Sequence, residues 1–206
     1  MSRHRLVIGT TNLKKGRELQ ELLAPFGFDV QTLKETGVPV LDVLEDADTF
    51  AANARKKASE QARHLNAWVM ADDSGLAVDA LGGRPGVYSA RYAGDDATDE
   101  LNNAKLLREL NETPLERRTA HYVCHVAVAD PDGEIRAESA DVCRGRIVFE
   151  PAGSNGFGYD PLFEVVEYHQ TFGQLGPHVK AALSHRGRAL RSVVPKLLAL
   201  ASRGEW

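Results

Sequence analysis

The stretch Trp68-Val69-Met70-Ala71-Asp72-Asp73-Ser74-Gly75 contains the pattern on which an interpretation of this chain depends. Its first four residues are apolar and predict a buried strand, and two adjacent carboxylates follow directly. The glycine behind them predicts that the backbone turns there. Carboxylates at a strand end suit a hard divalent cation, with water and phosphate oxygens as further ligands. Asp-Asp-Ser-Gly is also ordinary turn chemistry, so the stretch alone leaves both interpretations open.

The segments before this stretch predict the order strand, helix, strand, helix. Strands are expected at residues 6–9 and 28–33, where apolar residues cluster. Asn12 is expected to cap the first helix, and Thr49 to cap a second helix that runs to about His64. The second helix carries a narrow apolar stripe, which consists of Phe50, Ala54, Ala58 and Ala62.

The segments after it predict two more helices. Residues 99–110 form one of them, and its inward positions are expected to be Leu101, Ala104, Leu107 and Leu110. The other begins at Ser184 as its cap, and Pro195 within it predicts a kink or a break.

A hairpin is expected between these two helices. Residues 120–129 are apolar at nearly every position and predict a central strand. The turn Asp130-Pro131-Asp132-Gly133 leads into a second strand at 134–142, and residues 147–149 extend the sheet. The sequence therefore predicts an α/β fold with a mixed sheet, helices on its faces and a cleft where the polar turns gather.

Composition narrows the classes of function. The chain has 206 residues, of which 43% are hydrophobic and 26% charged, as in an ordinary globular protein. Its net charge of −4 argues against a general nucleic-acid binder, so attraction for an anionic ligand must come from local lysines and arginines. Cys124 and Cys143 form no C-x-x-C pattern, which indicates neither a disulfide framework nor a zinc site.

The N-terminal residues predict no targeting segment. Met1-Ser2-Arg3-His4-Arg5 is basic, but the apolar run of residues 6–8 behind it is too short for a signal peptide. No stretch has the length of a membrane-spanning helix, so we expect a cytoplasmic protein that binds no membrane.

Three further segments suggest a site for an anionic ligand with a flat ring. The turn Gly9-Thr10-Thr11-Asn12-Leu13-Lys14-Lys15 starts a helix and suits a phosphate, although a merely capped helix explains it equally well. It matches neither G-x-x-x-x-G-K-[ST] nor G-x-G-x-x-G. The glycines of Gly153–Pro161 allow Phe157 to stack on a base, or simply to anchor a surface loop.

The third segment is Lys180-Ala181-Ala182-Leu183-Ser184-His185-Arg186. A cation in the first turn of a helix is electrostatically unfavourable, so a ligand-facing role for Arg186 is attractive. His121 and His125 share a strand face, and we assign them no metal.

Taken in order, these motifs resemble the inosine triphosphate pyrophosphatase family over almost the whole chain. The matching motifs are Thr10-Thr11-Asn12-Leu13-Lys14-Lys15, Thr49-Phe50 with Asn53-Ala54 and Lys57-Ala58, Ala71-Asp72-Asp73-Ser74-Gly75-Leu76, Leu81-Gly82-Gly83 with Pro85-Gly86, Tyr88-Ser89-Ala90-Arg91-Tyr92, Gly156-Phe157-Gly158-Tyr159-Asp160-Pro161 and Ser184-His185-Arg186. Each match alone is weak, but the ordered set is highly specific.

The resemblance implies a fold and an activity. Residues 1–206 would form a single domain, with an elongated mixed sheet and flanking helices in two lobes around a central active-site cleft. The enzyme would hydrolyse inosine, deoxyinosine and xanthosine triphosphates (ITP, dITP and XTP) to the monophosphate and pyrophosphate, and so cleanse the nucleotide pool. It would use Mg²⁺ and form a homodimer.

The resemblance also implies roles for particular residues. Asp73 would accept the proton, and the metal ligands would be Glu45, Asp72 and Asp73. The groups that contact the phosphates would be Thr10, Thr11, Asn12, Lys14, Lys15, Lys57, Ser74 and Lys180. The groups around the base would be Phe157, Gly158, Tyr159, Asp160, His185 and Arg186.

Two positions depart from the family pattern. Ala52 stands where a glutamate often precedes the Asn-Ala pair, so Glu45 would matter more to the metal. Residues 175–179 lack the acidic residues common there, which bears on the reach of Lys180.

Three alternatives remain open. The chain could instead release the terminal phosphate, act on pyrimidine or modified nucleotides, or bind nucleotides without catalysis. The product, a substrate panel and Mg²⁺-dependent turnover of ITP distinguish them.

Overall fold

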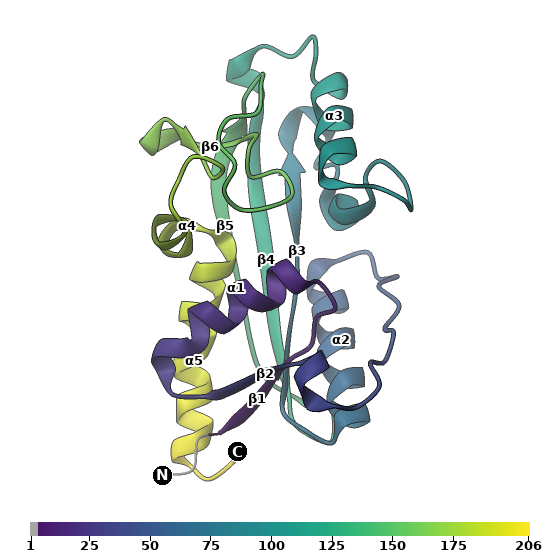
Figure 1. Ribbon diagram of the computed structural model, residues 1–206, viewed down its shortest axis with the longest axis vertical. Helices are drawn as coiled ribbons and strands as arrows, with labels where there is room; N and C mark the ends of the chain where they lie inside the picture. The colour runs from purple at the N-terminus through teal and green to yellow at the C-terminus, as the bar shows by residue number, and fades with distance from the viewer. Residues whose placement is uncertain (1–3) are drawn as a thin grey trace. The chain divides into compact units, whose positions relative to one another are not determined.

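A seven-stranded mixed sheet organises the chain, whose computed structural model describes residues 4–206 (Figure 1). The strand order is β2-β1-β3-β4-β5-β6-β7. The strands are β1 (Arg5–Ile8), β2 (Asp29–Thr32), β3 (Val69–Val78), β4 (Thr119–Ala129), β5 (Ile135–Ile147), β6 (Phe163–Val165) and β7 (Gln170–Thr171). β1 runs parallel to β2 and β3, whereas β6 runs antiparallel to β5 and β7.

Residues 4–206 also contain five α-helices and six short 3-10 turns, and the last two α-helices follow the final strand. The α-helices are α1 (Leu13–Leu23), α2 (Phe50–Leu65), α3 (Asp99–Glu109), α4 (Pro177–Leu183) and α5 (His185–Ser202). The 3-10 turns are η1 (Ala24–Phe26), η2 (Leu33–Thr36), η3 (Asp79–Leu81), η4 (Gly86–Arg91), η5 (Leu115–Arg117) and η6 (Val166–Tyr168). The predicted α/β class with a mixed sheet is confirmed. Within residues 4–206, none of the helices combines the length and apolar character needed to cross a membrane.

The chain divides into two compact units. The first consists of Met1–Asp73, Cys124–Asp141 and Arg188–Trp206, and the second of Ser74–Val123 and Val142–Gly187. β3, β4, β5 and α5 each contribute residues to both units. Of the basic N-terminal stretch considered above, Met1, Ser2 and Arg3 lie outside the described residues.

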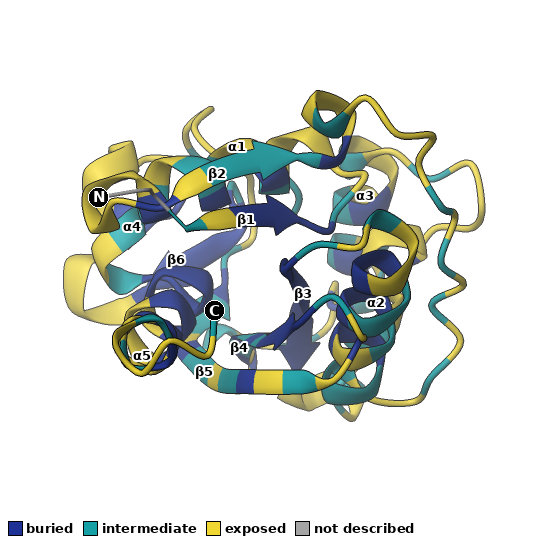
Figure 2. Cartoon of the chain, turned by 90° about the horizontal axis from the view of Figure 1, so that it is seen from below, coloured by how far each residue is buried: buried dark blue, intermediate teal, exposed yellow. Residues whose placement is uncertain are grey.

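The first unit has a core on each face of its strands, because successive strand residues point to opposite faces. On one face Leu6, Ile8 and Met70 pack with apolar residues of α1 and α5. On the other face Val7, Val69 and Ala71 pack against α2. The expected apolar stripe of α2 is confirmed at its three alanines, Ala54, Ala58 and Ala62, which are fully buried. Figure 2 shows β1 and β3 as buried strands in this unit.

The turn predicted at Gly75 is wrong, because β3 continues without interruption through Asp72, Asp73 and Ser74 to Val78. The strand lies between β1 and β4 and is buried along nearly its whole length. β1 pairs with β3 at Val69 and Met70, before the two carboxylates, and β4 pairs with β3 on the other side. This tertiary context and the burial of the strand outweigh the local turn preference of Asp-Asp-Ser-Gly. The two carboxylates are therefore successive strand residues that face opposite sides of the sheet.

The predicted inward face of α3 is wrong at two of its four positions. Leu101 is 52% exposed and Ala104 is exposed, whereas Leu107 is half-buried and Leu110 is buried. The inward face instead begins at Asn102, which accepts a hydrogen bond from the Ala93 amide and donates one to the Ala90 carbonyl. A buried asparagine that satisfies loop backbone groups does not appear in an apolar periodicity.

The C-terminal segment contains one helix more than expected. α4 precedes Ser184, whose hydroxyl accepts a hydrogen bond from the Gly187 amide and caps α5 as predicted. A break at Pro195 does not occur, since α5 continues to Ser202. Val193, Val194 and Leu197 on either side of the proline are buried, so packing holds the helix together there.

The hairpin prediction is confirmed at its turn. The Gly133 amide donates to the Asp130 carbonyl at 2.8 Å, and Gly133 has φ of 80°, which favours glycine. The second strand is longer than predicted, because β5 runs from Ile135 to Ile147 and absorbs the start of the predicted extension.

An aromatic cluster fixes the C-terminus of the first unit. The Trp206 ring stacks on Trp68 at 4.8 Å and on Phe28 at 5.3 Å between centroids. We expect Trp206→Ala to lower the free energy of unfolding by about 1–3 kcal/mol, through lost apolar burial and ring contacts. Thermal unfolding would then occur roughly 2–10 °C lower. Trp206→Phe, which retains a ring, is the control, and an unchanged midpoint in the alanine variant would contradict this role.

Candidate active site

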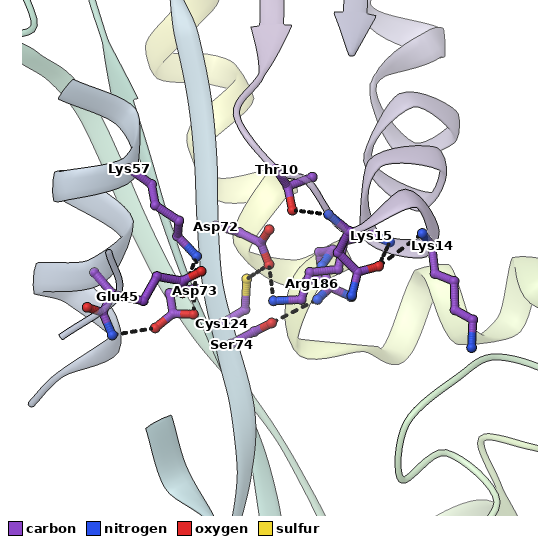
Figure 3. A network of polar contacts seen from close by, with 12 residues as sticks. Thr10, Lys14, Lys15, Glu45, Lys57, Asp72, Asp73, Ser74, Cys124 and Arg186 are labelled. Atoms are coloured by element: carbon purple, nitrogen blue, oxygen red, sulfur yellow. Dashed lines mark hydrogen bonds and ion pairs between the residues drawn. The ribbon is translucent and has the colours of Figure 1, made fainter. Parts of the chain in front are cut away.

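Asp73 is buried in the first unit and belongs to a polar group that also contains Lys57 and the partly exposed Glu45 (Figure 3). Asn53 is a further member of this group. The Lys57 ammonium lies 2.7 Å from Glu45 Oε2 and 3.3 Å from Asp73 Oδ1. The Asn53 amide donates to Asp73 Oδ2 at 3.1 Å. Asn53 and Lys57 are four residues apart on α2, so one helix face carries both groups to the strand.

Glu45 comes from an irregular segment, residues 37–49, that α2 holds in place. Asn53 Oδ1 accepts from the Ala47 amide at 3.0 Å, and Asn53 Nδ2 also lies 3.3 Å from the Ala47 carbonyl. Gln61 donates to the Leu41 carbonyl at 2.8 Å. These side chains stabilise a segment that has no regular hydrogen bonding of its own. The sequence analysis assigned no role to Asn53 or Gln61. The only sequence feature that could have indicated their role is that both are amide side chains on the same predicted helix as Lys57.

For both Asp73 and Lys57, burial and the neighbouring charges of opposite sign have contrary effects on the pKa. Burial raises the pKa of the Asp73 carboxyl above its ordinary value, although the ammonium groups of Lys57 and Lys15 act in the opposite direction. For Lys57, burial alone would lower the pKa, but the nearby carboxylates, foremost that of Asp73, raise it above its ordinary value. Asp73 is thereby a stronger base than an exposed aspartate, and Lys57 remains charged.

Asp72 faces the other side of β3 and contacts a different lysine. The Lys15 ammonium lies 3.8 Å from Asp72 Oδ2, and the Cys124 thiol lies 4.0 Å from the same oxygen. The structure thus brings Glu45 and Asp73 together through Lys57, and it places Asp72 with Lys15 on the opposite face (Figure 3).

The turn before α1 is an ordered cap. Asn12 Oδ1 accepts from the amides of Lys14 and Lys15, at 3.0 and 3.1 Å. The Thr10 hydroxyl accepts from the Asn12 amide, whereas Thr11 and Lys14 are exposed. The predicted cap at Asn12 is confirmed.

The donors around Lys57 fit a small, hard cation. Within the described part of the chain, no three acidic, histidine or cysteine side chains form a ready-made metal cluster. Mg²⁺ is commonly held by only one or two carboxylates, with water and substrate phosphates completing its shell. Glu45 Oε2 and Asp73 Oδ1 contact the same ammonium at 2.7 and 3.3 Å, so they lie at most 6.0 Å apart. Both groups are oxygen donors of the kind that Mg²⁺ prefers, and a cation that arrives with a polyphosphate would draw its remaining ligands from phosphate and water.

The second unit contains another buried polar group, centred on Asp160. Asp160 Oδ2 accepts from the Lys180 ammonium at 2.7 Å and from the Phe157 amide at 2.8 Å. The Tyr122 hydroxyl lies 3.4 Å from Asp160 Oδ1. The Lys180 ammonium is 4.7 Å from the centroid of the Phe157 ring, a cation–π distance. A carboxylate, an ammonium and an aromatic ring are therefore adjacent.

The loop around Phe157 depends on its glycines. Gly156 and Gly158 have φ of 76° and 62°, in the left-handed region that favours glycine. A Cβ at Gly156 would clash with Asp160 Oδ2. The glycine thus allows the backbone to approach the carboxylate closely, and the Phe157 amide bonds to the same carboxylate.

Three further predicted residues of the second unit lie near this group or in its core. The Arg186 guanidinium donates to the Ser74 hydroxyl at 2.8 Å and lies 5.7 Å from the Phe157 ring centroid. His185 stacks on Tyr122, with centroids 4.6 Å apart. Tyr159 donates to the Ser89 carbonyl at 2.8 Å, and burial raises the pKa of its hydroxyl.

Comparison with known proteins identifies the relatives of this chain. The sequence profile of the Ham1 family matches residues 6–196. A dITP/XTP pyrophosphatase from Rhodopirellula baltica is 56% identical over 95% of this chain and 93% of its own length. One from Nostoc sp. is 47% identical over 96% of both chains.

Solved structures give the same result. A HAM1 protein from Coxiella burnetii has a TM-score of 0.84 and 37% identity, covering 95% of this chain and 99% of its own. A nucleoside-triphosphatase, or dITP/XTP pyrophosphatase, from Mycobacterium abscessus has a TM-score of 0.73 and 40% identity, covering 91% and 97%. The chain belongs to the Ham1 family. The resemblance inferred from its motifs is confirmed, while the roles of individual residues stay predictions.

Proposed function

We propose that this chain hydrolyses deaminated purine nucleoside triphosphates, namely ITP, dITP and XTP, to the monophosphate and pyrophosphate. The names of its relatives support this reaction, since they are dITP/XTP pyrophosphatases. The observation that carries the proposal is the buried carboxylate of Asp73, held between the Asn53 amide and the Lys57 ammonium beside Glu45. This group combines a base, a fixed positive charge and oxygen donors for a cation.

Asp73 is the proposed proton acceptor for water that attacks the α-phosphorus. Its raised pKa makes Oδ1 or Oδ2 a better base, because efficiency increases as the pKa approaches the working pH. The Asn53 amide and Lys57 ammonium fix the orientation of the carboxylate. Lys57 also supplies positive charge that needs no rearrangement during the reaction.

Glu45 and Asp73 are the proposed ligands of Mg²⁺. The bound ion would neutralise phosphate charge and lower the pKa of water. Asp72, which the resemblance includes among the metal ligands, contacts Lys15 instead, so we propose that it orients this lysine. Lys15 would bind the phosphates together with Lys14 and with groups of the turn before α1, namely Thr10, Thr11 and Asn12.

The proposed base site distinguishes purines by hydrogen-bond polarity. Hypoxanthine and xanthine present an N1–H donor beside a 6-oxo acceptor, whereas adenine presents an acceptor beside a donor. Asp160 and Lys180 offer the complementary pair, an acceptor 2.7 Å from a donor. Although the resemblance assigns Lys180 to the phosphates, its contacts with Asp160 and Phe157 favour the base. A site of this kind discriminates by roughly 10⁴-fold, because mismatched buried groups go unpaired.

The remaining predicted residues complete this proposal. Phe157 would stack on the base, and Gly158, Tyr159, His185 and Arg186 would shape its surroundings. Ser74, bonded to Arg186, would contact the nucleotide. A homodimer and a cytoplasmic location are also part of the proposal, and sedimentation of the purified chain tests the first.

A substrate panel scored for both phosphate products tests the reaction. The purified chain would be incubated with Mg²⁺ and ITP, dITP, XTP, ATP, GTP or CTP. We expect pyrophosphate from the first three and little product from ATP or CTP. GTP presents the same N1–H and 6-oxo groups as ITP, so its turnover measures whether the 2-amino group is rejected. Orthophosphate would indicate a terminal phosphatase, preference for CTP a different nucleotide class, and binding without turnover a regulatory module.

Asn53 provides a prediction about the support of the catalytic carboxylate. Asn53→Ala removes a donor to Asp73 and both bonds to Ala47, so Glu45 and Asp73 lose their shared support. We expect kcat/KM for ITP to fall about 10- to 100-fold, which corresponds to 1.4–2.8 kcal/mol. Gln61→Ala removes only the bond to Leu41 and should have a smaller effect. Equal losses in the two variants would contradict the role of Asn53.

A further inference from the structure

Helix α3 holds the backbone of the loop that carries Phe157. Asp99 Oδ2 accepts a hydrogen bond from the Gly158 amide at 3.0 Å. Asn103 Nδ2 donates one to the Gly158 carbonyl, also at 3.0 Å. Asp99 and Asn103 are four residues apart, so one face of α3 bonds both backbone groups of a single glycine.

Gly158 has no side chain with which to make stabilising contacts within the loop. Its neighbours are bonded elsewhere, the Phe157 amide to Asp160 and the Tyr159 hydroxyl to the Ser89 carbonyl. Gly158 has no side chain and a φ of 62°, so its peptide groups rotate easily unless something binds them. The two bonds from α3 supply that constraint.

Asn103 is held in one orientation to make this contact. Its Oδ1 is buried and has no hydrogen-bond partner among the described residues. Rotation of the amide by 180° would place this oxygen against the Gly158 carbonyl, which also accepts only, so the bond to Gly158 fixes the side chain. A buried oxygen without a hydrogen bond lowers the stability of the fold. The position of Asn103 therefore calls for an explanation other than stability.

The helix that supplies these groups is itself firmly anchored. Thr98 caps it through the Leu101 amide, and Asn102 bonds to Ala90 and Ala93. Leu106 and Leu110 are fully buried in the core of the second unit. Because α3 is held firmly in place, the hydrogen bonds from Asp99 and Asn103 hold Gly158 in a fixed position relative to the helix.

We propose that Asp99 and Asn103 are positioning residues that preset the Phe157 ring for stacking on the purine base. This inference rests on the proposed function and assigns these two residues to base affinity rather than to phosphate chemistry. Ordering one backbone residue costs about 1–2 kcal/mol, so a loop ordered in advance binds the base about 5- to 30-fold more tightly.

The test compares a ligand that has the base with one that lacks it. Calorimetry with Mg²⁺ would measure the affinities of inosine monophosphate and pyrophosphate for the full chain and for Asp99→Ala and Asn103→Leu. We expect each variant to bind inosine monophosphate about 5- to 30-fold more weakly, with pyrophosphate affinity within about twofold. In turnover of ITP, KM should rise by the same factor while kcat stays within about twofold.

Conservative and control variants separate positioning from general damage. Asp99→Asn retains an oxygen that accepts from Gly158 and should restore most of the affinity. Glu100→Ala removes an acidic residue from the same turn of α3 and should leave both affinities unchanged. Parallel losses for both ligands would show a merely structural role and overturn the proposal, as would unchanged inosine monophosphate binding in both variants or none in the parent chain. If the parent chain releases pyrophosphate from ITP, the proposed function stands whichever of these results is obtained.

Discussion

Asp73→Asn is expected to lower kcat for ITP hydrolysis by at least about 10³-fold in a protein that remains folded. The amide can still accept from Asn53, but it cannot take a proton from water and is a poor ligand for a hard cation. Steady-state release of pyrophosphate measures the loss, and circular dichroism verifies the fold.

The same variant should be at least as stable as the parent at neutral pH. Burial raises the pKa of Asp73, so the folded state binds its proton more tightly than the unfolded state does. Stability from this group is therefore complete below the unfolded pKa and is lost as pH rises through the folded pKa. Asparagine avoids that loss, so the stability advantage of the variant should disappear below about pH 4.

Asp46→Asn is the matched control. Asp46 lies in the same segment as Glu45, but its carboxylate is exposed and pairs with Lys56. Because exposed ion pairs contribute little, turnover should stay within about twofold of the parent value. Near-normal turnover in Asp73→Asn would remove Asp73 from the reaction.

Elements with strong local signals were predictable from the sequence. Asn12 and Thr49 cap α1 and α2 as expected, because the cap residue, the following amides and the apolar spacing all lie within one short segment. The turn at Asp130 was predictable for the same reason. In each case local preference and tertiary structure agree.

The sequence-based predictions were wrong where residues distant in the sequence determine the local structure. Asp-Asp-Ser-Gly continues as strand because β3 pairs with β4 and is buried, and neither fact is evident from the stretch itself. Asn102 occupies the inward face of α3 because loop backbone groups at Ala90 and Ala93 need partners. A pattern of apolar residues does not detect a buried amide whose partners are backbone groups.

The candidate site shows the same division. Motif resemblance singled out Glu45, Lys57 and Asp73, and the structure joins them through one ammonium. The sequence did not predict that Asp72 and Asp73 face opposite sides, because this follows from strand geometry rather than from residue type. The supporting amides were missed as well, since their role depends on what lies beside them in space.

Lys180→Met is expected to reduce the preference for ITP over ATP, because kcat/KM should fall for ITP much more than for ATP. The substitution retains the length of the side chain and removes the ammonium that lies 2.7 Å from Asp160 and 4.7 Å from the Phe157 ring centroid. A hydrogen bond from a charged donor contributes about 2–3 kcal/mol, so kcat/KM for ITP should fall roughly 30- to 150-fold. ATP, whose 6-amino group cannot accept from Lys180, should lose little.

Lys105→Met is the matched control, because Lys105 also lies over an aromatic ring of the second unit, 4.3 Å from the Tyr92 centroid. Its substitution should leave the ratio of ITP to ATP turnover unchanged. Measuring both nucleotides on one preparation makes the ratio independent of the fraction of folded protein. If Lys180 binds phosphates instead, both substrates lose activity equally and the ratio stays constant. A falling ratio places Lys180 at the base edge, where the adjacent acceptor and donor match a 6-oxopurine and oppose adenine.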